Sequence, residues 1–194
     1  MPNAIDKPQL RAQVNTRRDG IPAADRAARS AHLLREVLAL PQVFAAQHIF
    51  VFVSHGSEVD THPIIDTLLD AGKQVAVPLI LPRKDDPDRR MLAVPIDSRG
   101  DLTPGVMGIL SPPKPETQDP PPDFSPDLVL TPGVAFSQQS PGKIARLGYG
   151  GGYYDRYLAR HPEAQTVGLG FTEQVVVRLP VEPHDVMLQS LVTC

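Results

Sequence analysis

The segment Arg146-Leu-Gly-Tyr-Gly-Gly-Gly-Tyr-Tyr-Asp-Arg-Tyr-Leu158 places a run of glycines between an apolar stretch and a helical pattern. Glycine lacks a Cβ atom, so the run can take positive φ and let backbone N–H groups approach a ligand closely. Tyr154, Tyr157 and Leu158 recur at helical spacing, which predicts that a helix begins after Gly152. The unpaired N–H groups and the partial positive charge of a helix N-terminus favour an anion, so this stretch predicts phosphate binding.

A turn in which the glycines only permit close packing is the alternative, because the segment matches neither the Walker pattern nor the GxGxxG fingerprint cleanly. The neighbouring tyrosines favour a ligand site, since aromatic faces beside an exposed turn are costly unless something covers them. Asp155, in the first helical turn, could cap the helix or hold a divalent cation that bridges to phosphate oxygens.

Length and composition predict a single soluble domain of 194 residues, with 41% hydrophobic and 21% charged residues. No apolar run approaches the roughly 20 residues that span a bilayer, and the first 20 residues show no secretory signal, so we expect a cytoplasmic protein without a membrane segment. Cys194 is the only cysteine, which leaves neither a disulfide framework nor a cysteine-based zinc site. A net charge of −3 argues against a general nucleic-acid binder.

Apolar runs of strand length alternate with helical patterns along the chain. We expect two N-terminal helices within residues 7–40, a helix over 61–72, and a proline-rich loop around residues 111–126. The predicted strands are 48–53, 74–81, 91–96, 127–131, 166–170 and 186–192. This alternation predicts an α/β fold: one domain, residues 1–194, with a mainly parallel sheet flanked by helices in a doubly wound, open Rossmann-like arrangement.

The residue patterns of the two N-terminal helices predict a basic face on the first helix and a buried face on the second. Lys7 and Arg11 are one turn apart, so both cations could reach one anion, although a solvated charged face is the alternative. In the second helix the predicted buried side consists of Ala27, Ala31, Leu34, Val37 and Leu38.

The loop after the first strand, residues 54–61, is a predicted ligand site, because sites in open α/β sheets form beyond the carboxyl ends of the strands. Glu58 and Asp60 are its candidate residues. A metal cluster of Glu58 with His55 and His62 is disfavoured, since the spacing fits no standard zinc pattern.

The chain resembles the 5-formyltetrahydrofolate cyclo-ligase family, also called methenyltetrahydrofolate synthetases. The likeness extends over nearly the whole length and is most specific in residues 146–158. The other matching blocks are Lys7-x-x-x-Arg11 and residues 54–61, 105–109, 127–136 and 180–185.

The resemblance implies closure of 5-formyltetrahydrofolate to 5,10-methenyltetrahydrofolate, with ATP as co-substrate, Mg²⁺ as cofactor, and no obligate protein partner. It implies that ATP is bound by Lys7, Arg11, Arg146, Gly148, Tyr149, Gly150, Gly151, Gly152, Tyr153 and Tyr154. It implies that the folate is contacted by Val53, Glu58, Tyr149 and Tyr153, and that Mg²⁺ is held by Asp155 and Asp185. No residue is assigned as nucleophile or general acid, because the chemistry consists of positioning charges around a transferring phosphoryl group.

The chain departs from the family pattern before the glycine run. Family members commonly approach it through a short FDxxGxRLG stretch, whereas the approach over residues 136–146 is longer and places Ser137 where an aspartate is usual. One alternative that fits this departure is a noncatalytic nucleotide- or folate-binding protein of the same fold. A further alternative is a sugar-phosphate or CoA-ester enzyme of similar architecture. Dependence on Mg-ATP separates the cyclo-ligase from both.

Overall fold

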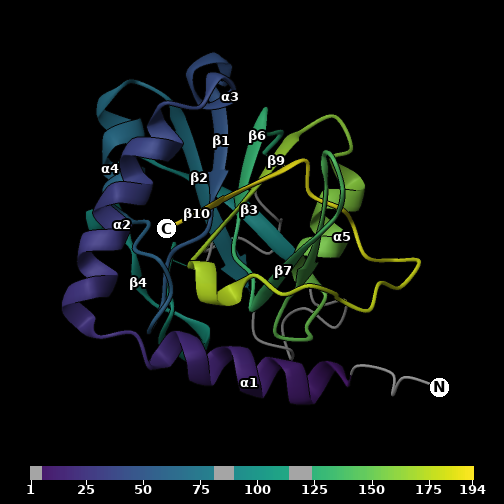
Figure 1. Cartoon of the computed structure of the whole chain (residues 1–194). Coiled ribbons are helices and arrows are strands. Elements are labelled where there is room, and N and C mark those ends of the chain that lie inside the picture. Colours follow the sequence, from purple (N-terminus) through teal and green to yellow (C-terminus); the bar gives the residue numbers. More distant parts are fainter. Residues whose placement is uncertain (1–5, 81–89, 114–123) are drawn as a thin grey trace.

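A six-stranded sheet forms the centre of the computed structural model, which describes residues 6–80, 90–113 and 124–194 (Figure 1). The strands lie in the order β10-β9-β6-β1-β2-β3, and every neighbouring pair is parallel except β2 with β3. Their bounds are β1 His48–Val51, β2 Gln74–Ile80, β3 Met91–Ile96, β6 Leu128–Thr131, β9 Gln165–Gly170 and β10 Ser190–Thr193. The predicted mainly parallel sheet is confirmed.

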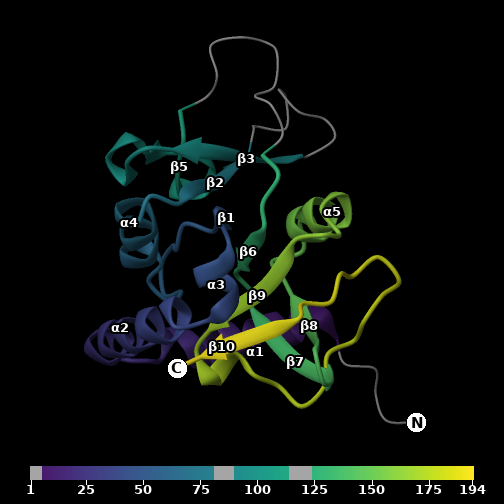
Figure 2. The ribbon, with the colours of Figure 1, turned by 90° about the horizontal axis from the view of Figure 1, so that it is seen from above.

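Helices cover both faces of this sheet, as Figure 2 shows with α2 and α4 on one side and α5 on the other. Alternation along β1 explains why: Ile49 and Val51 face the cluster that contains α2 and α4, while Phe50 faces the cluster around α5. The bounds are α1 Lys7–Asp19, α2 Ala23–Leu38, α3 Pro41–Ala45, α4 His62–Asp70 and α5 Tyr153–Arg160. The doubly wound prediction is therefore confirmed.

The strand order reverses between β1 and β6. From β1 the chain crosses through α4 to β2 on one side, whereas from β6 it continues through α5 to β9 on the other. In open α/β sheets a crevice forms outside the carboxyl ends of the strands at such a point. The loop after β1 and the segment after β6 therefore flank the expected ligand site.

Short elements complete the described parts of the chain. They are η1 Arg99–Asp101, β4 Thr103–Pro104, η2 Val106–Gly108, β5 Leu110–Ser111, β7 Ala135–Ser140, β8 Lys143–Leu147 and η3 Thr172–Gln174. Most of the expected proline-rich loop, residues 114–123, lies outside the described residues. Within the described ranges, no helix combines the length and apolar character that crossing a membrane requires.

The long approach to the glycine run is a hairpin rather than a loop. Strands β7 and β8 pair antiparallel, and the turn between them contains Gly142 with φ of 69°. Phe136 and Ile144 are buried against the α5 side of the sheet. The apolar residues at the base of the hairpin fix it to the core, while its polar tip is exposed.

The expected strand over 186–192 is wrong in its first half, since β10 covers only Ser190–Thr193. The backbone of the residues just before β10 forms hydrogen bonds outside the pairing of β10 with β9. Leu188 forms an isolated antiparallel bridge with Ile144, and the backbone N–H of Gln189 donates to Thr166 Oγ1 at 3.0 Å. These contacts hold residues 186–189 against β8 and the start of β9, so the segment joins the sheet only at Ser190.

The buried side of α2 also differs from the prediction. Ser30, Leu33 and Val37 are buried, whereas Ala27 and Ala31 are exposed. Alanine gains little from burial, and the buried Ser30 hydroxyl accepts a hydrogen bond from the Asp60 N–H at 3.0 Å. Relative to the prediction, α2 is therefore rotated about its axis so that Ser30 contacts the loop after β1.

Candidate active site

Helix α1 runs along the carboxyl edge of the parallel strands, at the bottom of Figure 1. Its Arg11 side chain donates from Nε to the Gly148 carbonyl at 2.8 Å, which ties the helix to the glycine run. Arg18, two turns further, donates from Nε to Ser57 Oγ at 2.8 Å and from Nη1 to Tyr149 Oη at 3.1 Å. A helix distant in sequence thus contacts both predicted ligand loops.

The glycine run ends at the N-terminus of α5, as predicted. Gly150 has φ of 103°, and Gly152, the residue before the helix, has φ of 64°, so both adopt backbone conformations that favour glycine. A Cβ on Gly151 would lie 2.6 Å from Tyr153 Cε2, so the bare backbone is also needed for packing. Tyr153 itself is half-buried, and its ring lies 5.3 Å from the Arg156 guanidinium.

Arg146 holds the base of the run in a buried position. Its Nη2 donates to Asp155 Oδ1 at 3.0 Å, and its guanidinium lies 5.4 Å from the Tyr154 ring. Its Nε is buried without a hydrogen-bond partner among the described residues. Burial raises the pKa of Tyr154 well above its ordinary value, so this tyrosine stays neutral beside the arginine.

The two predicted metal carboxylates lie on adjoining segments. Asp155 Oδ1 accepts a hydrogen bond from the Val186 N–H at 3.3 Å, directly after Asp185 in the chain. Asp185 Oδ2 accepts from Lys7 Nζ at 3.4 Å and from the Glu182 N–H at 2.8 Å. Among the described residues, no group of three or more His, Cys, Asp or Glu side chains is arranged to hold a metal ion.

Lys7 therefore faces acidic residues. Its Nζ lies 3.0 Å from Glu182 Oε1 in addition to Asp185. Burial works to lower the pKa of Lys7, but hydrogen bonds and attraction from these two carboxylates together raise it above its ordinary value. The lysine is charged at neutral pH and is placed on the 182–186 bend rather than on the glycine run.

Glu58 lies at the topological switch point. Its Oε2 accepts a hydrogen bond from the His55 N–H at 3.0 Å, and its carboxylate also interacts with the Tyr149 hydroxyl. Burial raises the pKa of Glu58, while the His55 N–H, the Arg18 charge and the Tyr149 hydroxyl oppose that rise.

The predicted site residues thus divide into groups. Arg11, the glycine run and Arg146 form one group, Glu58 and Tyr149 form a second beside it, and Lys7 and Asp185 lie at the far end of α1. Val53 is 3% exposed and belongs to the apolar cluster on the α2 and α4 side of the sheet.

Comparisons with known proteins identify the family of this chain. The model of the 5-formyltetrahydrofolate cyclo-ligase family matches residues 3–194. The chain belongs to this family.

Individual relatives extend the likeness. The 5-formyltetrahydrofolate cyclo-ligase of Escherichia coli K12 is 35% identical over 159 residues, covering 81% of this chain and 83% of that protein. The mouse 5-formyltetrahydrofolate cyclo-ligase is 29% identical over 189 residues, covering 94% and 90%. The NMR structure of Aquifex aeolicus 5,10-methenyltetrahydrofolate synthetase matches with a TM-score of 0.76 at 27% identity, covering 96% of this chain and 89% of that one.

Within the cyclo-ligase family pattern, the unusual residue Ser137 is accommodated inside the hairpin. It is buried, its hydroxyl donates to the Val177 carbonyl at 3.1 Å, and it accepts from Gln139 Nε2 at 3.1 Å. The substitution therefore leaves no unpaired group at this position.

Sequence reasoning missed Arg18, and it did not single out Ser57 within the predicted loop 54–61 or Glu182 within the block 180–185. A signal for Arg18 existed, because residues seven apart share a helix face and Arg18 follows Arg11 by seven. Nothing in the sequence indicated that Glu182 would reach Lys7, since that contact depends on the tertiary path of the chain.

Proposed function

We propose that this cyclo-ligase converts 5-formyltetrahydrofolate and ATP into 5,10-methenyltetrahydrofolate, ADP and phosphate. The observation that carries the proposal is the position of Tyr149. This residue belongs to the glycine run at the N-terminus of α5. Its hydroxyl accepts a hydrogen bond at 3.1 Å from Arg18, which also donates to Ser57, the residue before Glu58 at the switch point. A loop of the kind that binds phosphate therefore lies next to a carboxylate that can accept hydrogen bonds from the N–H groups of a pterin. Transfer of a phosphoryl group between two bound substrates requires this proximity.

The chemistry explains the need for ATP. A formamide oxygen is a weak nucleophile and a poor leaving group, so it must first be phosphorylated. The formyl oxygen attacks the γ-phosphorus, ADP leaves, and N5 carries an imidoyl-phosphate group. N10 then attacks the formyl carbon, the C–O bond breaks with loss of phosphate, and the N10 proton is released as the methenyl bridge forms.

The residues of the chain position charge around this transfer. Arg146 and Arg11 lie beside the glycine run and would neutralise phosphate oxygens, together with the N–H groups at the start of α5. Glu58 would accept hydrogen bonds from the pterin and hold its reactive edge toward the loop. Tyr153 and Tyr154 would exclude water on the α5 side of the glycine run.

Lys7 would join the nucleotide site by moving. In the structure its ammonium group pairs with Glu182 and Asp185, so contact with phosphate requires an exchange of partners. The long, flexible lysine side chain permits that exchange without movement of α1.

The carboxylates of Asp155 and Asp185 are suitable Mg²⁺ ligands when phosphate oxygens of the substrate supply further ligands. Both are hard oxygen donors on adjoining segments, and Mg²⁺ usually combines one or two carboxylates with substrate phosphates and water. When bound, Mg²⁺ would neutralise charge on the transferring phosphoryl group. Asp155 and Asp185 would hold it, with Arg146 and the Val186 N–H fixing the orientation of Asp155.

The proposal includes a cytoplasmic location and two small-molecule ligands, ATP and 5-formyltetrahydrofolate, without an obligate protein partner. A single cysteine, which leaves the fold independent of disulfides, supports the location.

A direct test is incubation of the purified chain with 5-formyltetrahydrofolate, ATP and Mg²⁺ while recording absorbance of the conjugated methenyl group. We expect absorbance to grow only when all three are present. Tight binding of both ligands without growth would indicate the noncatalytic alternative, and a lack of folate binding would indicate a different substrate class.

A further inference from the structure

Arg18 is a buried arginine at the meeting point of three segments. It lies on α1 and is 5% exposed. Its Nε donates to Ser57 Oγ in the loop after β1, and its Nη1 donates to Tyr149 Oη in the glycine run. Its Nη2 lies 3.6 Å from Asp19 Oδ1, and Ser57 also donates to Asp19.

Burying a guanidinium is costly unless hydrogen bonds satisfy it. Two of the partners that satisfy Arg18 are neutral hydroxyls on different loops, one on each side of the switch point. The planar fork of arginine fixes the angle between its donors, so holding one hydroxyl in place constrains the other. A lysine, with one ammonium group, would not impose this geometry.

We propose that Arg18 is a positioning residue that couples nucleotide binding to folate binding by tying Tyr149 of the glycine run to Ser57 beside Glu58. The inference rests on the proposed function, because it assigns ATP to the glycine run and the folate to Glu58. A nucleotide that orders the glycine run then orders the folate loop through Arg18. By thermodynamic reciprocity the folate raises the affinity for nucleotide by the same factor.

Arg18 has a second effect, on the charge of Glu58. The groups that face this carboxylate are Arg18 from α1, the N–H and the imidazole of His55 from its own loop, Tyr149 from the glycine run and Tyr154 from α5. The positive charge of Arg18 opposes the rise that burial causes in the pKa of Glu58. Removing that charge raises the pKa of Glu58 further, so folate affinity that needs the carboxylate begins to fall at a higher pH.

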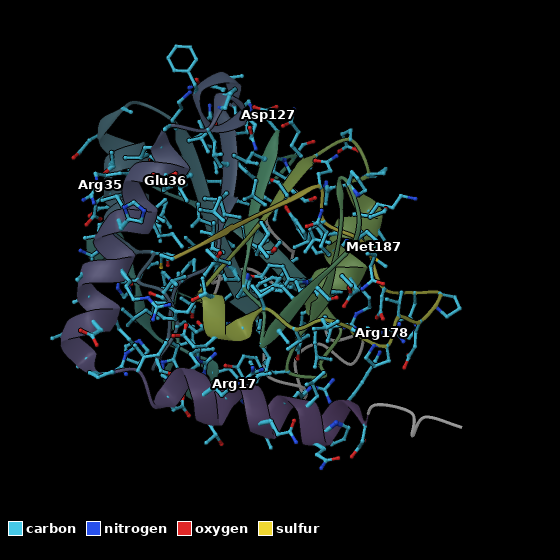
Figure 3. The ribbon with its side chains drawn as sticks, viewed as in Figure 1. Arg17, Arg35, Glu36, Asp127, Arg178 and Met187 are labelled. Carbon is cyan, nitrogen blue, oxygen red and sulfur yellow. The ribbon has the colours of Figure 1, made fainter. Side chains whose placement is uncertain are left out.

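The test is calorimetric titration of the β,γ-imido analogue of ATP into the whole chain with Mg²⁺, without and with saturating 5-formyltetrahydrofolate. The wild type should bind the analogue at least about fivefold tighter when folate is present. In Arg18→Met, which keeps length and loses the hydrogen bonds, this ratio should fall to about one. Arg17→Met is the matched control, because Arg17 is the exposed neighbour on α1, and it should keep the wild-type ratio (Figure 3).

A conservative variant separates geometry from charge. Arg18→Lys should keep the pH dependence of folate affinity near that of the wild type while losing most of the coupling. Arg18→Met should lose the coupling and also shift the fall of folate affinity to a higher pH. If Arg18 served only the stability of the fold, its substitution would change neither the ratio of the two nucleotide affinities nor the pH dependence of folate affinity. If Arg18→Met does not fold, Tyr149→Phe and Ser57→Ala each remove one of the two hydroxyls and should each lower the ratio.

An unchanged ratio in Arg18→Met, or in both hydroxyl variants, would overturn the proposal. So would a wild type that forms methenyltetrahydrofolate but binds the two ligands independently. Absence of methenyl formation by the wild type would instead overturn the proposed function, so the two failures are distinguishable.

Discussion

The carboxylate of Glu58 is held in surroundings that resist its charge. Burial raises its pKa above the ordinary value of 4.5, and the His55 N–H, Arg18 and Tyr149 only partly offset this. A carboxyl whose pKa is higher in the fold than in the unfolded chain destabilises the fold as pH rises from 4.5 through the raised value. A half-buried carboxylate maintained against this cost is typical of a functional site.

Glu58→Gln should therefore raise the thermal midpoint by a few degrees at neutral pH while raising the KM for 5-formyltetrahydrofolate about tenfold or more, since a charged hydrogen bond contributes about 1.5–3 kcal/mol. The stability gain should vanish below pH 4.5, where both forms are neutral. Thermal unfolding followed from pH 4 to 8 checks this, with the exposed Glu36→Gln on α2 as control (Figure 3). A variant less stable than the wild type at neutral pH would contradict the expected direction.

Asp155 and Asp185 carry the proposed contribution to the metal. Asp155→Asn and Asp185→Asn should each raise the Mg²⁺ concentration needed for half-maximal rate, by about tenfold, with a less than additive loss in the double variant because both changes affect one ion. Titration of Mg²⁺ at saturating ATP measures this.

Asp127→Asn is the control for the metal experiment. Asp127 lies at the opposite edge of the sheet from α1, where its Oδ2 accepts from the Gln47 and His48 N–H groups at 2.8 Å (Figure 3). It should lose stability without a change in Mg²⁺ requirement. Wild-type Mg²⁺ dependence in both Asp155→Asn and Asp185→Asn would rule the pair out as ligands.

At the scale of elements, the glycine run depends on backbone conformations that other residues adopt at a cost. Gly150→Ala, at φ of 103°, should cost about 1–2 kcal/mol and raise the KM for ATP, because the run must shift to relieve the strain. Gly142→Ala is the matched control, since it has φ of 69° in the β7–β8 turn with open space around a Cβ. Equal KM values for ATP in the two variants would show that the run does not bind nucleotide.

Helix α2 is fastened to η3 by a charged pair. Arg29 donates to both carboxylate oxygens of Glu173, at 2.8 and 2.6 Å, and its hydrogen bond lowers the pKa of Glu173 from 4.5 to about 2. A depressed carboxyl pKa contributes stability that is present above 4.5 and is lost as pH falls toward 2.

Arg29→Met should lower stability at pH 7 by about 1 kcal/mol, because the pair is partly exposed and screened. The wild type should lose this advantage between pH 4.5 and 2, so the two stability curves should meet near pH 2. Denaturant titration across this range measures it. A constant difference at every pH would assign the loss to packing over Phe171 instead, where the guanidinium lies 4.9 Å from the ring.

Elements with strong local patterns were predictable and those set by tertiary contact were not. The apolar runs of β1, β2 and β6 each fill a strand that is buried on both faces, so their sequences alone indicated a parallel sheet. The β7–β8 hairpin was not predicted, because its tip is polar and its apolar residues, such as Phe136, Ile144 and Leu147, pack against distant parts of the chain. The buried face of α2 was predicted from its apolar residues, alanines included. In the structure Ser30 is on the buried face instead, because its hydroxyl accepts a hydrogen bond from the Asp60 N–H.

Over the whole molecule, the strand order places the loop after β1 opposite the segment that follows β6, and α1 spans both from the carboxyl edge (Figure 1). The sequence indicated the two loops and the basic pair on α1, and the family resemblance indicated their ligands. Which contacts join them, such as Arg18 with Ser57 and Tyr149, depends on the path of α1 across the sheet and could not be predicted from spacing in the chain.

In the proposed mechanism ATP phosphorylates the formyl oxygen of the bound folate at this junction. The most direct measurement uses 5-formyltetrahydrofolate labelled with ¹⁸O in the formyl group and analyses the released phosphate by mass spectrometry. This mechanism predicts one ¹⁸O atom in each inorganic phosphate and one ADP for each methenyltetrahydrofolate formed. Unlabelled phosphate, or methenyl formation without ADP, would contradict it.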